Sequence, residues 1–423
     1  MRGRDFTQTA LFSTKPLNRR IPHNHPLRKL RVIVDFALRE MDSDFEAMYD
    51  ATRGRESIPP EQLLRAMLVQ ILFSVRSERQ LMEQMEYNLL FRWFVGLEMD
   101  QEVWNHSTFS ANRCRLLNHD VARKFFDQVL AVARSQALLS TEHFSVDGTL
   151  IEAMGSLKSI VPRASAAAAL PESVPPSTGP TSDAEVPTEQ AVASEQALPA
   201  AAEPAPSAPV VANPTPESAR PEAQGRNGWV DFKGKERRND THVSTTDPDA
   251  KLYCKGAHQT TELSWMGHAL MENRNGLLCD VTLTPATGTA EREAAEAMAQ
   301  RSIHVRGATL GSDKGYDVKA HVAALKKQGV RAHAAQNNKG RKSAIDGRTA
   351  CSKGYKASQK FRKRIEEFFG WVKCVGNLRK SKFFGAERTE MAFLMAAAGY
   401  NLVRMMGLFG WRIVTPAGEV RPA

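Results

Sequence analysis

The chain has 423 residues, with 57 Lys and Arg against 47 Asp and Glu and a formal net charge of +10. This length predicts two or three domains, and the basic excess favours a polyanionic partner, nucleic acid first, over a merely solvated basic face. Five scattered cysteines without a CxxC pair argue against a zinc ribbon or a disulfide framework and fit a reducing cytosol. No signal peptide is expected, because the N-terminal MRGRDFTQTALF has no apolar run. No membrane partner is expected either, because the most apolar stretch, 391–411, is broken by Asn401 and Arg404 and indicates a buried core helix.

Residues 1–140 are predicted to form a mostly helical domain for DNA binding and oligomerisation. Apolar residues recur at helical spacing in PLRKLRVIVDFALREM and in the segment that follows Pro59 and Pro60. A turn and a short basic helix, STFSANRCRLL, place Arg113 and Arg115 in a candidate helix-turn-helix that would bind DNA. The alternative is a helical bundle that only packs against the next domain.

A strand-like run, HFSVDGTLIEA, begins the next region and carries Asp147, although an Asp before a Gly is also typical of a turn. Residues 161–227 then contain no aromatic residue and no Ile, and are rich in Ala and Pro. Such a segment cannot bury enough apolar surface to offset its ordering entropy, so we expect disorder. We interpret it as an insertion within one domain, because Asp147 precedes it and the expected partners of Asp147 follow it.

The pattern after Trp229 predicts a layered α/β domain. A polar, loop-like segment (233–253) precedes two strands joined by the turn NRNG, a typical hairpin signal. The pattern then predicts a helix (289–302), a strand ending near Asp313 (308–313), a helix (318–328) and a short strand (330–335). A basic loop (336–356) and a last helix (361–373) follow. This order predicts a sheet with helices packed against it.

The last helix, FRKRIEEFFGWVK, has an apolar stripe with Arg362, Glu366 and Lys373 together beside it and Glu367 on the opposite side. A surface helix with Arg–Glu pairing is the alternative interpretation. Residues 333–385 hold fourteen Lys or Arg against three acids. We expect charges in this region to hold DNA phosphates, among them Arg341, Lys342, Arg379 and Lys380.

The order of elements resembles the ribonuclease-H-like fold. The segments HFSVDGTLIEA, SDKGYD, RKRIEEFFGWVK and GRESIPPEQLLRAMLVQILFSVRSERQL resemble DDE insertion-sequence transposases of the IS-five group, over about 25–408. The resemblance implies a metal-binding catalytic triad of Asp147, Asp313 and Glu366, with Arg362 and Lys373 on DNA phosphates. Gln359 stands where the family usually has Tyr, and the Ala/Pro-rich insertion departs from the compact family core.

Carboxylates of this kind suit Mg²⁺, or Mn²⁺ in its place, and two such ions can clamp the attacking and leaving oxygens of a phosphoryl transfer. The expected partners are double-stranded DNA, as terminal inverted repeats and target, and a second copy of the chain in a homodimer on DNA. The expected catalytic core covers 141–160 and 228–410, with 411–423 as a tail. The alternatives are a metal-dependent nuclease without strand transfer and a transposase-derived DNA-binding protein.

Overall fold

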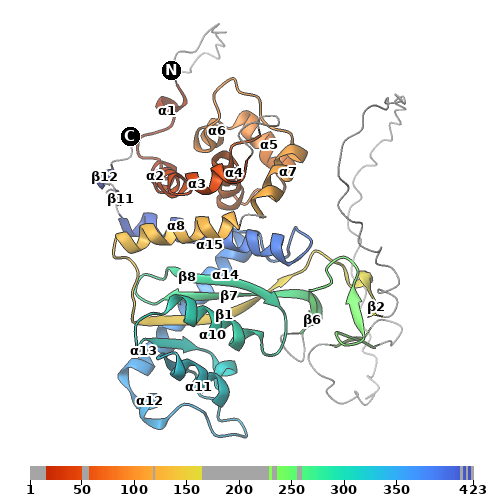
Figure 1. The fold of residues 1–423 in the computed structure, drawn as a ribbon, viewed down its shortest axis with the longest axis vertical. Helices are drawn as coiled ribbons and strands as arrows, with labels where there is room; N and C mark the ends of the chain where they lie inside the picture. The colour runs from red at the N-terminus through yellow and green to blue at the C-terminus, as the bar shows by residue number, and fades with distance from the viewer. Residues whose placement is uncertain are drawn as a thin grey trace, which may run out of the picture.

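The computed structural model shows a helical N-terminal region stacked on an α/β domain (Figure 1). Helices α8 (Val121–Ser135) and α15 (Ala386–Phe409) lie between the two and contact each other along their length. The structure describes residues 16–49, 57–117, 120–163, 228–230, 236–254, 260–409, 413–415 and 418–420.

The N-terminal region is helical, as the sequence predicts. Ser77 and Asn88 cap two of its helices by accepting backbone N–H groups of the first turn. The bounds are α1 Leu17–Arg20, α2 Pro26–Arg39, α3 Asp42–Glu46, α4 Pro60–Leu72, α5 Glu78–Tyr87, α6 Leu89–Val95 and α7 His106–Leu117. Buried residues of these helices share one hydrophobic cluster with α14 (Ile365–Cys374) and α15, so the region is packed onto the α/β domain.

The central sheet combines antiparallel and parallel strands. Its main strands run β8-β7-β1-β9-β10, with β7 antiparallel to β1 and β8, and β9 parallel to β1 and β10. This is the order of a ribonuclease-H-like sheet, with a hairpin on one side and two crossover strands on the other. The bounds are β1 His143–Glu152, β6 Lys251–Tyr253, β7 Glu262–Glu272, β8 Leu278–Pro285, β9 Thr309–Ser312 and β10 Arg331–Ala334.

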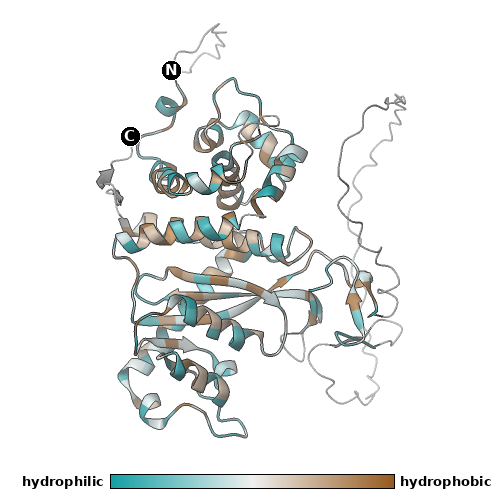
Figure 2. Ribbon diagram, in the orientation of Figure 1, coloured by the Kyte–Doolittle hydropathy of each residue, from teal (hydrophilic) through white to brown (hydrophobic). Residues whose placement is uncertain are grey.

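Helices cover both faces of the sheet. On one face α10 (Ala290–Ser302) and α11 (Lys319–Lys327) pack with Phe144 and Val146 of β1. On the other face α13 (Lys353–Phe361) crosses β9, and α14 and α15 share a hydrophobic cluster with Ile151 of β1. Tyr355 of α13 belongs to the cluster of the first face. The strands of the sheet are largely hydrophobic, whereas α8 alternates polar and hydrophobic turns (Figure 2). Successive residues of a strand point to opposite faces of its sheet, so Asp147 shares the face of Ile151, which is covered by α14 and α15.

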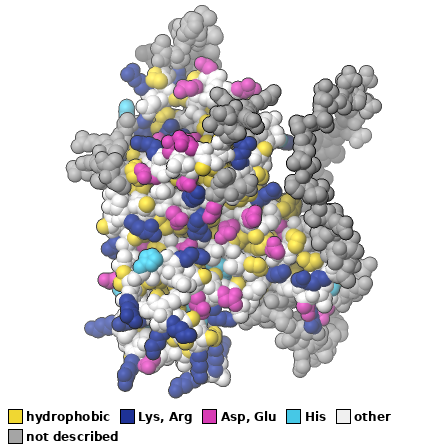
Figure 3. Space-filling model, viewed as in Figure 1, with side chains coloured by type: hydrophobic (Ala, Val, Ile, Leu, Met, Phe, Trp, Pro, Cys, Tyr) yellow, Lys and Arg dark blue, Asp and Glu magenta, His cyan; other side chains and the backbone are white. Residues whose placement is uncertain are grey.

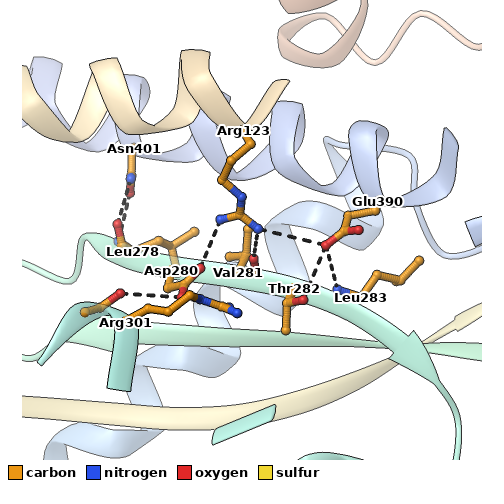
Figure 4. A network of polar contacts seen from close by, with 10 residues as sticks. Arg123, Leu278, Asp280, Val281, Thr282, Leu283, Arg301, Glu390 and Asn401 are labelled. Atoms are coloured by element: carbon orange, nitrogen blue, oxygen red, sulfur yellow. Dashed lines mark hydrogen bonds and ion pairs between the residues drawn. The ribbon is translucent and has the colours of Figure 1, made fainter. Parts of the chain in front are cut away.

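Side chains from α8 and α15 close the outer edge of β8 (Figure 4). Asn401 accepts from the Leu278 N–H at 2.9 Å and donates to its carbonyl at 3.0 Å. Arg123 donates to the Val281 carbonyl at 2.6 Å and pairs with Asp280 at 3.0 Å. These contacts satisfy backbone groups that an edge strand otherwise leaves open to other chains.

Helix α15 confirms the core helix expected over 391–411. Among the described residues it is the one helix long and apolar enough to cross a membrane, and 67% of its apolar window is buried inside the protein. Its contacts with β8, α8 and α4 account for that burial. The composition of this helix is therefore explained by its place in the core.

Several local predictions are wrong. The loop-like segment 233–253 contains β4 (Glu236–Arg238), β5 (His242–Ser244) and β6. The basic loop contains α12 (Gly347–Cys351), which Asp346 caps, and the start of α13, which Ser352 caps. The helix expected over 361–373 is divided by a 3-10 turn, η3 (Arg362–Arg364). Polar strands and short capped helices lack the apolar periodicity on which the predictions depended.

The expected insertion and tail fall largely outside the described residues. Val161 and Pro162, predicted to begin a disordered segment, belong instead to β2 (Ile160–Pro162), which pairs with β5. The predicted disorder over 164–227 lies outside the described residues. The remaining short elements are η1 Leu157–Ser159, β3 Gly228–Val230, η2 Lys314–Tyr316, β11 Ile413–Thr415 and β12 Gly418–Val420. The last two pair within the expected tail.

Candidate active site

Asp147 lies on β1, and Asp313 directly follows β9, the parallel neighbour of β1. The register pairs Ser145 of β1 with Gly311 of β9, and two residues further along the strands stand Asp147 and Asp313. Both aspartates are half-buried, and each accepts a backbone N–H close to it, from Gly148 at 2.8 Å and from Gly315 at 2.7 Å. Asp313 is the first residue beyond β9, where this strand leaves β1, so both carboxylates stand where the two strands separate.

The helical run α13–η3–α14 crosses the same face of the sheet. A Cβ at Gly311 would lie 3.4 Å from the Ser358 carbonyl and 3.5 Å from the Arg362 Cβ, so a glycine permits this close crossing. Further along the run, α14 contacts β1 and buries Ile365, Phe368, Phe369 and Val372. Glu366 is an exposed residue of α14, the helix that contacts β1, the strand of Asp147.

The donor set suits a hard divalent cation. Asp147 and Asp313 offer carboxylate oxygens, the ligands that Mg²⁺ and Mn²⁺ prefer. In the described part of the chain no three His, Cys, Asp or Glu residues are close enough together to hold a metal ion. Asp147, Asp313 and Glu366 are therefore not close enough together in this structure to hold an ion as a set of three.

The expected phosphate-binding residues of the helical run have different surroundings. Arg362 is half-buried and donates to the Gln359 side chain at 3.1 Å, and Gln359 in turn donates to the His333 carbonyl at the end of β10. Gln359, which replaces the usual Tyr, thus fixes the guanidinium of Arg362 above β9. Lys373 is half-buried on α14.

A buried carboxylate organises the loop that carries Arg341 and Lys342. Asp317 is 1% exposed and accepts the backbone N–H groups of Asn337 at 2.7 Å and Ala344 at 2.8 Å. Arg341 adds a hydrogen bond to the Asp317 carbonyl. Asp317, four residues beyond Asp313, thereby fixes both ends of this basic loop. The sequence pattern did not indicate this role.

The exposed cations gather on the α/β domain. Lys and Arg side chains concentrate at the end of the molecule that carries α11 and α12 (Figure 3). Arg341, Lys342, Arg379 and Lys380 are all exposed, and Lys380 pairs with Glu152 of β1. Their exposure is compatible with the expected contacts to DNA phosphates.

The structure does not favour a DNA contact by Arg113. This side chain is buried, pairs with Glu78 and lies 4.4 Å from the centre of the Phe383 ring. It joins α5 and α7 to the loop before α15, so we leave it out of the proposed DNA contacts. Arg115, two residues on, is exposed beside the ring of Tyr49 and stays a candidate.

Two site residues escaped the sequence analysis, Tyr316 and Glu291. Burial, together with the nearby charges of Glu291, Asp147 and Asp313, raises the pKa of Tyr316 well above its usual value. Tyr316 stands in the segment SDKGYD, where its neighbour Asp313 could have drawn attention to it. Glu291 lies in the first turn of an Ala-rich helix, and nothing in that pattern marks it.

Comparison with known families identifies two segments. Residues 15–115 match the family described as Transposase domain (DUF772), and residues 240–402 match the family described as Transposase DDE domain. The chain belongs to the DDE-type transposases. The DDE match contains Asp313 and Glu366 and begins after Asp147. No curated protein and no solved structure matches the chain.

Family membership confirms a transposase with a ribonuclease-H-like domain, acting in DNA transposition and recombination. Such enzymes cleave and join DNA, and generally use divalent metal ions. The narrower assignment to the IS-five group remains a prediction.

Proposed function

We propose that this transposase binds the terminal inverted repeats of an insertion sequence, cleaves DNA at the ends of the element and joins the freed 3′-hydroxyl groups to target DNA. The placement of Asp147 beside Asp313, where two parallel strands of the sheet separate, carries the proposal. Two neighbouring carboxylates offer the oxygen ligands that a hard divalent cation prefers, so the arrangement supports a metal-dependent reaction.

Asp147, Asp313 and Glu366 are the proposed cation ligands, with Mg²⁺ as the proposed ion. Bound divalent cations supply charge stabilisation and activate water or a 3′-hydroxyl for attack on a phosphodiester. Glu366 is exposed on a helix packed against β1, so its side chain is free to turn toward the aspartates when DNA is present.

Arg362 and Lys373 flank Glu366 on the same helical run, and their charges would position the scissile strand. The hydrogen bond from Arg362 to Gln359 fixes one of these cations before DNA arrives. The exposed cations Arg341, Lys342, Arg379 and Lys380 would bind the flanking backbone without reading its sequence. Arg115 of α7 is the remaining candidate for a contact with the repeats.

A strand-transfer assay tests the proposal. The full chain is incubated with Mg²⁺, a donor DNA carrying the terminal repeats, and a supercoiled target. The proposal predicts cleavage at the repeat ends and covalent joining of donor to target, and both products should depend on the repeat sequence. Cleavage without joining would instead favour a nuclease, and repeat binding without cleavage would favour a DNA-binding protein derived from a transposase.

Two copies of the chain should act together, because both element ends must be joined in one event. We propose a homodimer on DNA, which mass measurement of the complex with repeat DNA tests. We also propose that the protein acts in the cytoplasm on the nucleoid.

A further inference from the structure

Glu291 approaches the backbone beside both aspartates from the α10 side of the sheet. If Gly148 carried a Cβ, that atom would lie 3.1 Å from the Glu291 Cγ and 3.2 Å from its Oε1. A Cβ at Gly315 would lie 3.8 Å from the other carboxylate oxygen, Oε2, and 3.1 Å from the Asp313 Oδ1. The Glu291 carboxylate thus spans from the residue after Asp147 to the loop that holds Asp313.

Two buried polar atoms of this region lack hydrogen-bond partners among the described residues: the Tyr316 hydroxyl and the His268 Nδ1. Both side chains are 0% exposed. His268 sits opposite Gly148 on β7, and its Nδ1 lies 3.3 Å from the same Gly148 Cβ position that Glu291 approaches. The other ring nitrogen, Nε2, contacts the Thr284 hydroxyl at 2.7 Å, which fixes the orientation of the ring.

A buried hydroxyl and a buried imidazole nitrogen rarely stay unpaired in native proteins, and ordered water is the usual partner. Glu291 and His268 both approach the Cβ position of Gly148, and the charge of Glu291 acts on Tyr316. The three groups are therefore neighbours on the α10 side of the sheet, beside the backbone that carries Asp147 and Asp313. Groups behind metal ligands commonly orient those ligands and tune the metal.

We propose that Glu291 is a positioning residue for the cation site, and that with Tyr316 and His268 it holds water molecules belonging to the hydration shell of the cation at Asp147 and Asp313. This inference rests on the proposed function, since it needs the cation to bind at those aspartates. Mg²⁺ usually retains several of its waters in protein sites, so an acceptor placed behind the direct ligands has a ready role.

A simpler role is available to Glu291, because acids in the first turn of a helix interact favourably with its dipole. Glu293 shares that turn and that charge, and it is exposed to solvent. Glu293→Gln is therefore a matched control that changes the helix charge equally and leaves Glu291, Tyr316 and His268 unchanged.

The test is a Mn²⁺ titration of the full chain without DNA, followed by electron paramagnetic resonance. Glu291→Gln should weaken Mn²⁺ binding by about tenfold, the loss typical of groups behind metal ligands, and Glu293→Gln should stay within about twofold. Cleavage by Glu291→Gln should recover at high Mg²⁺, which a general folding defect would not allow. Equal Mn²⁺ affinity for the two variants would overturn the inference.

Asp147→Asn separates this outcome from a failure of the proposed function. If Asp147→Asn loses Mn²⁺ binding while Glu291→Gln retains it, only the inference fails. If Asp147→Asn binds Mn²⁺ like the wild type, both the proposed cation site and the inference about Glu291 fail. Should circular dichroism show that Glu291→Gln does not fold, Glu291→Asp takes its place against Glu293→Asp, and equal affinities again overturn the inference.

Discussion

The buried imidazole of His268 shows how strongly a single residue depends on its surroundings. Burial lowers the pKa of His268 from 6.5 to about 4. Between these two pH values the unfolded chain binds a proton that the folded chain does not. The free energy of unfolding should therefore fall as the pH drops through this window, by about 3 kcal/mol when the drop is complete.

Urea unfolding between pH 7 and pH 4 measures this contribution of His268. His268→Gln should show a shallower loss of stability with acid than the wild type does. The exposed His304 is the control, and His304→Gln should follow the wild-type curve. An unchanged curve for His268→Gln would mean that this imidazole is protonated inside the folded protein.

Arg113 and Arg115 provide a contrast on one helix. Arg113→Ala leaves the Glu78 carboxylate without its buried partner, so it should lower the free energy of unfolding by about 3 kcal/mol. Arg115→Ala removes an exposed charge and should cost less than about 0.5 kcal/mol. Denaturant melts check both values, and a stable Arg113→Ala that loses only repeat binding would restore Arg113 as a DNA contact.

The positions of Asp147 and Asp313 were predictable because each stands in or directly after a strand-like run, and their roles as cation ligands stay a prediction. The surroundings of a side chain were not predictable where a partner distant in sequence determines them. Helical periodicity places Arg113 on a face of α7, but its partner Glu78 lies on another helix. Glu291 likewise gains its place from the folding of α10 against β1.

At the scale of elements, the closure of the β8 edge accounts for the position of α15. Asn401→Ala would leave the Leu278 N–H and carbonyl buried without partners, at a cost of about 2–3 kcal/mol. Differential scanning calorimetry should show a melting temperature several degrees lower, whereas Asn338→Ala, in an exposed position, should melt like the wild type. Equal melting of the two variants would show that the edge contact contributes no stability.

Long elements with apolar periodicity followed from the sequence, including the hairpin β7–β8, α10 and α11, and the short strand β10 was expected as well. The short strands β4, β5 and β6 did not follow, because their residues lack an apolar alternation, and β5 also depends on pairing with the distant β2. The 3-10 turn at 362–364 also went unpredicted, because the helical wheel treats Phe361 to Lys373 as one straight helix.

For the molecule as a whole, the basic charge should make DNA binding steeply dependent on salt. Replacing Arg341 and Lys342 with Gln should lower affinity for repeat and random DNA by similar factors. The slope of log affinity against log salt should flatten by up to about two units, since each phosphate contact contributes about 0.9. Fluorescence anisotropy with both DNAs measures this, and loss of repeat binding alone would mean that the loop reads sequence.

The strand order of the sheet brings Asp147 beside Asp313 from positions 166 residues apart, and the helical run carries Glu366 to the same face. The central claim is that these three carboxylates form one cation site. It is tested most directly by Mg²⁺-dependent cleavage of repeat-end DNA with Asp147→Asn, Asp313→Asn and Glu366→Gln, each keeping the size of the side chain and removing its charge. All three variants should lose cleavage and still bind DNA, while Glu367→Gln, on the neighbouring exposed residue, should stay active. Substantial cleavage by any of the three would contradict the claim for that residue.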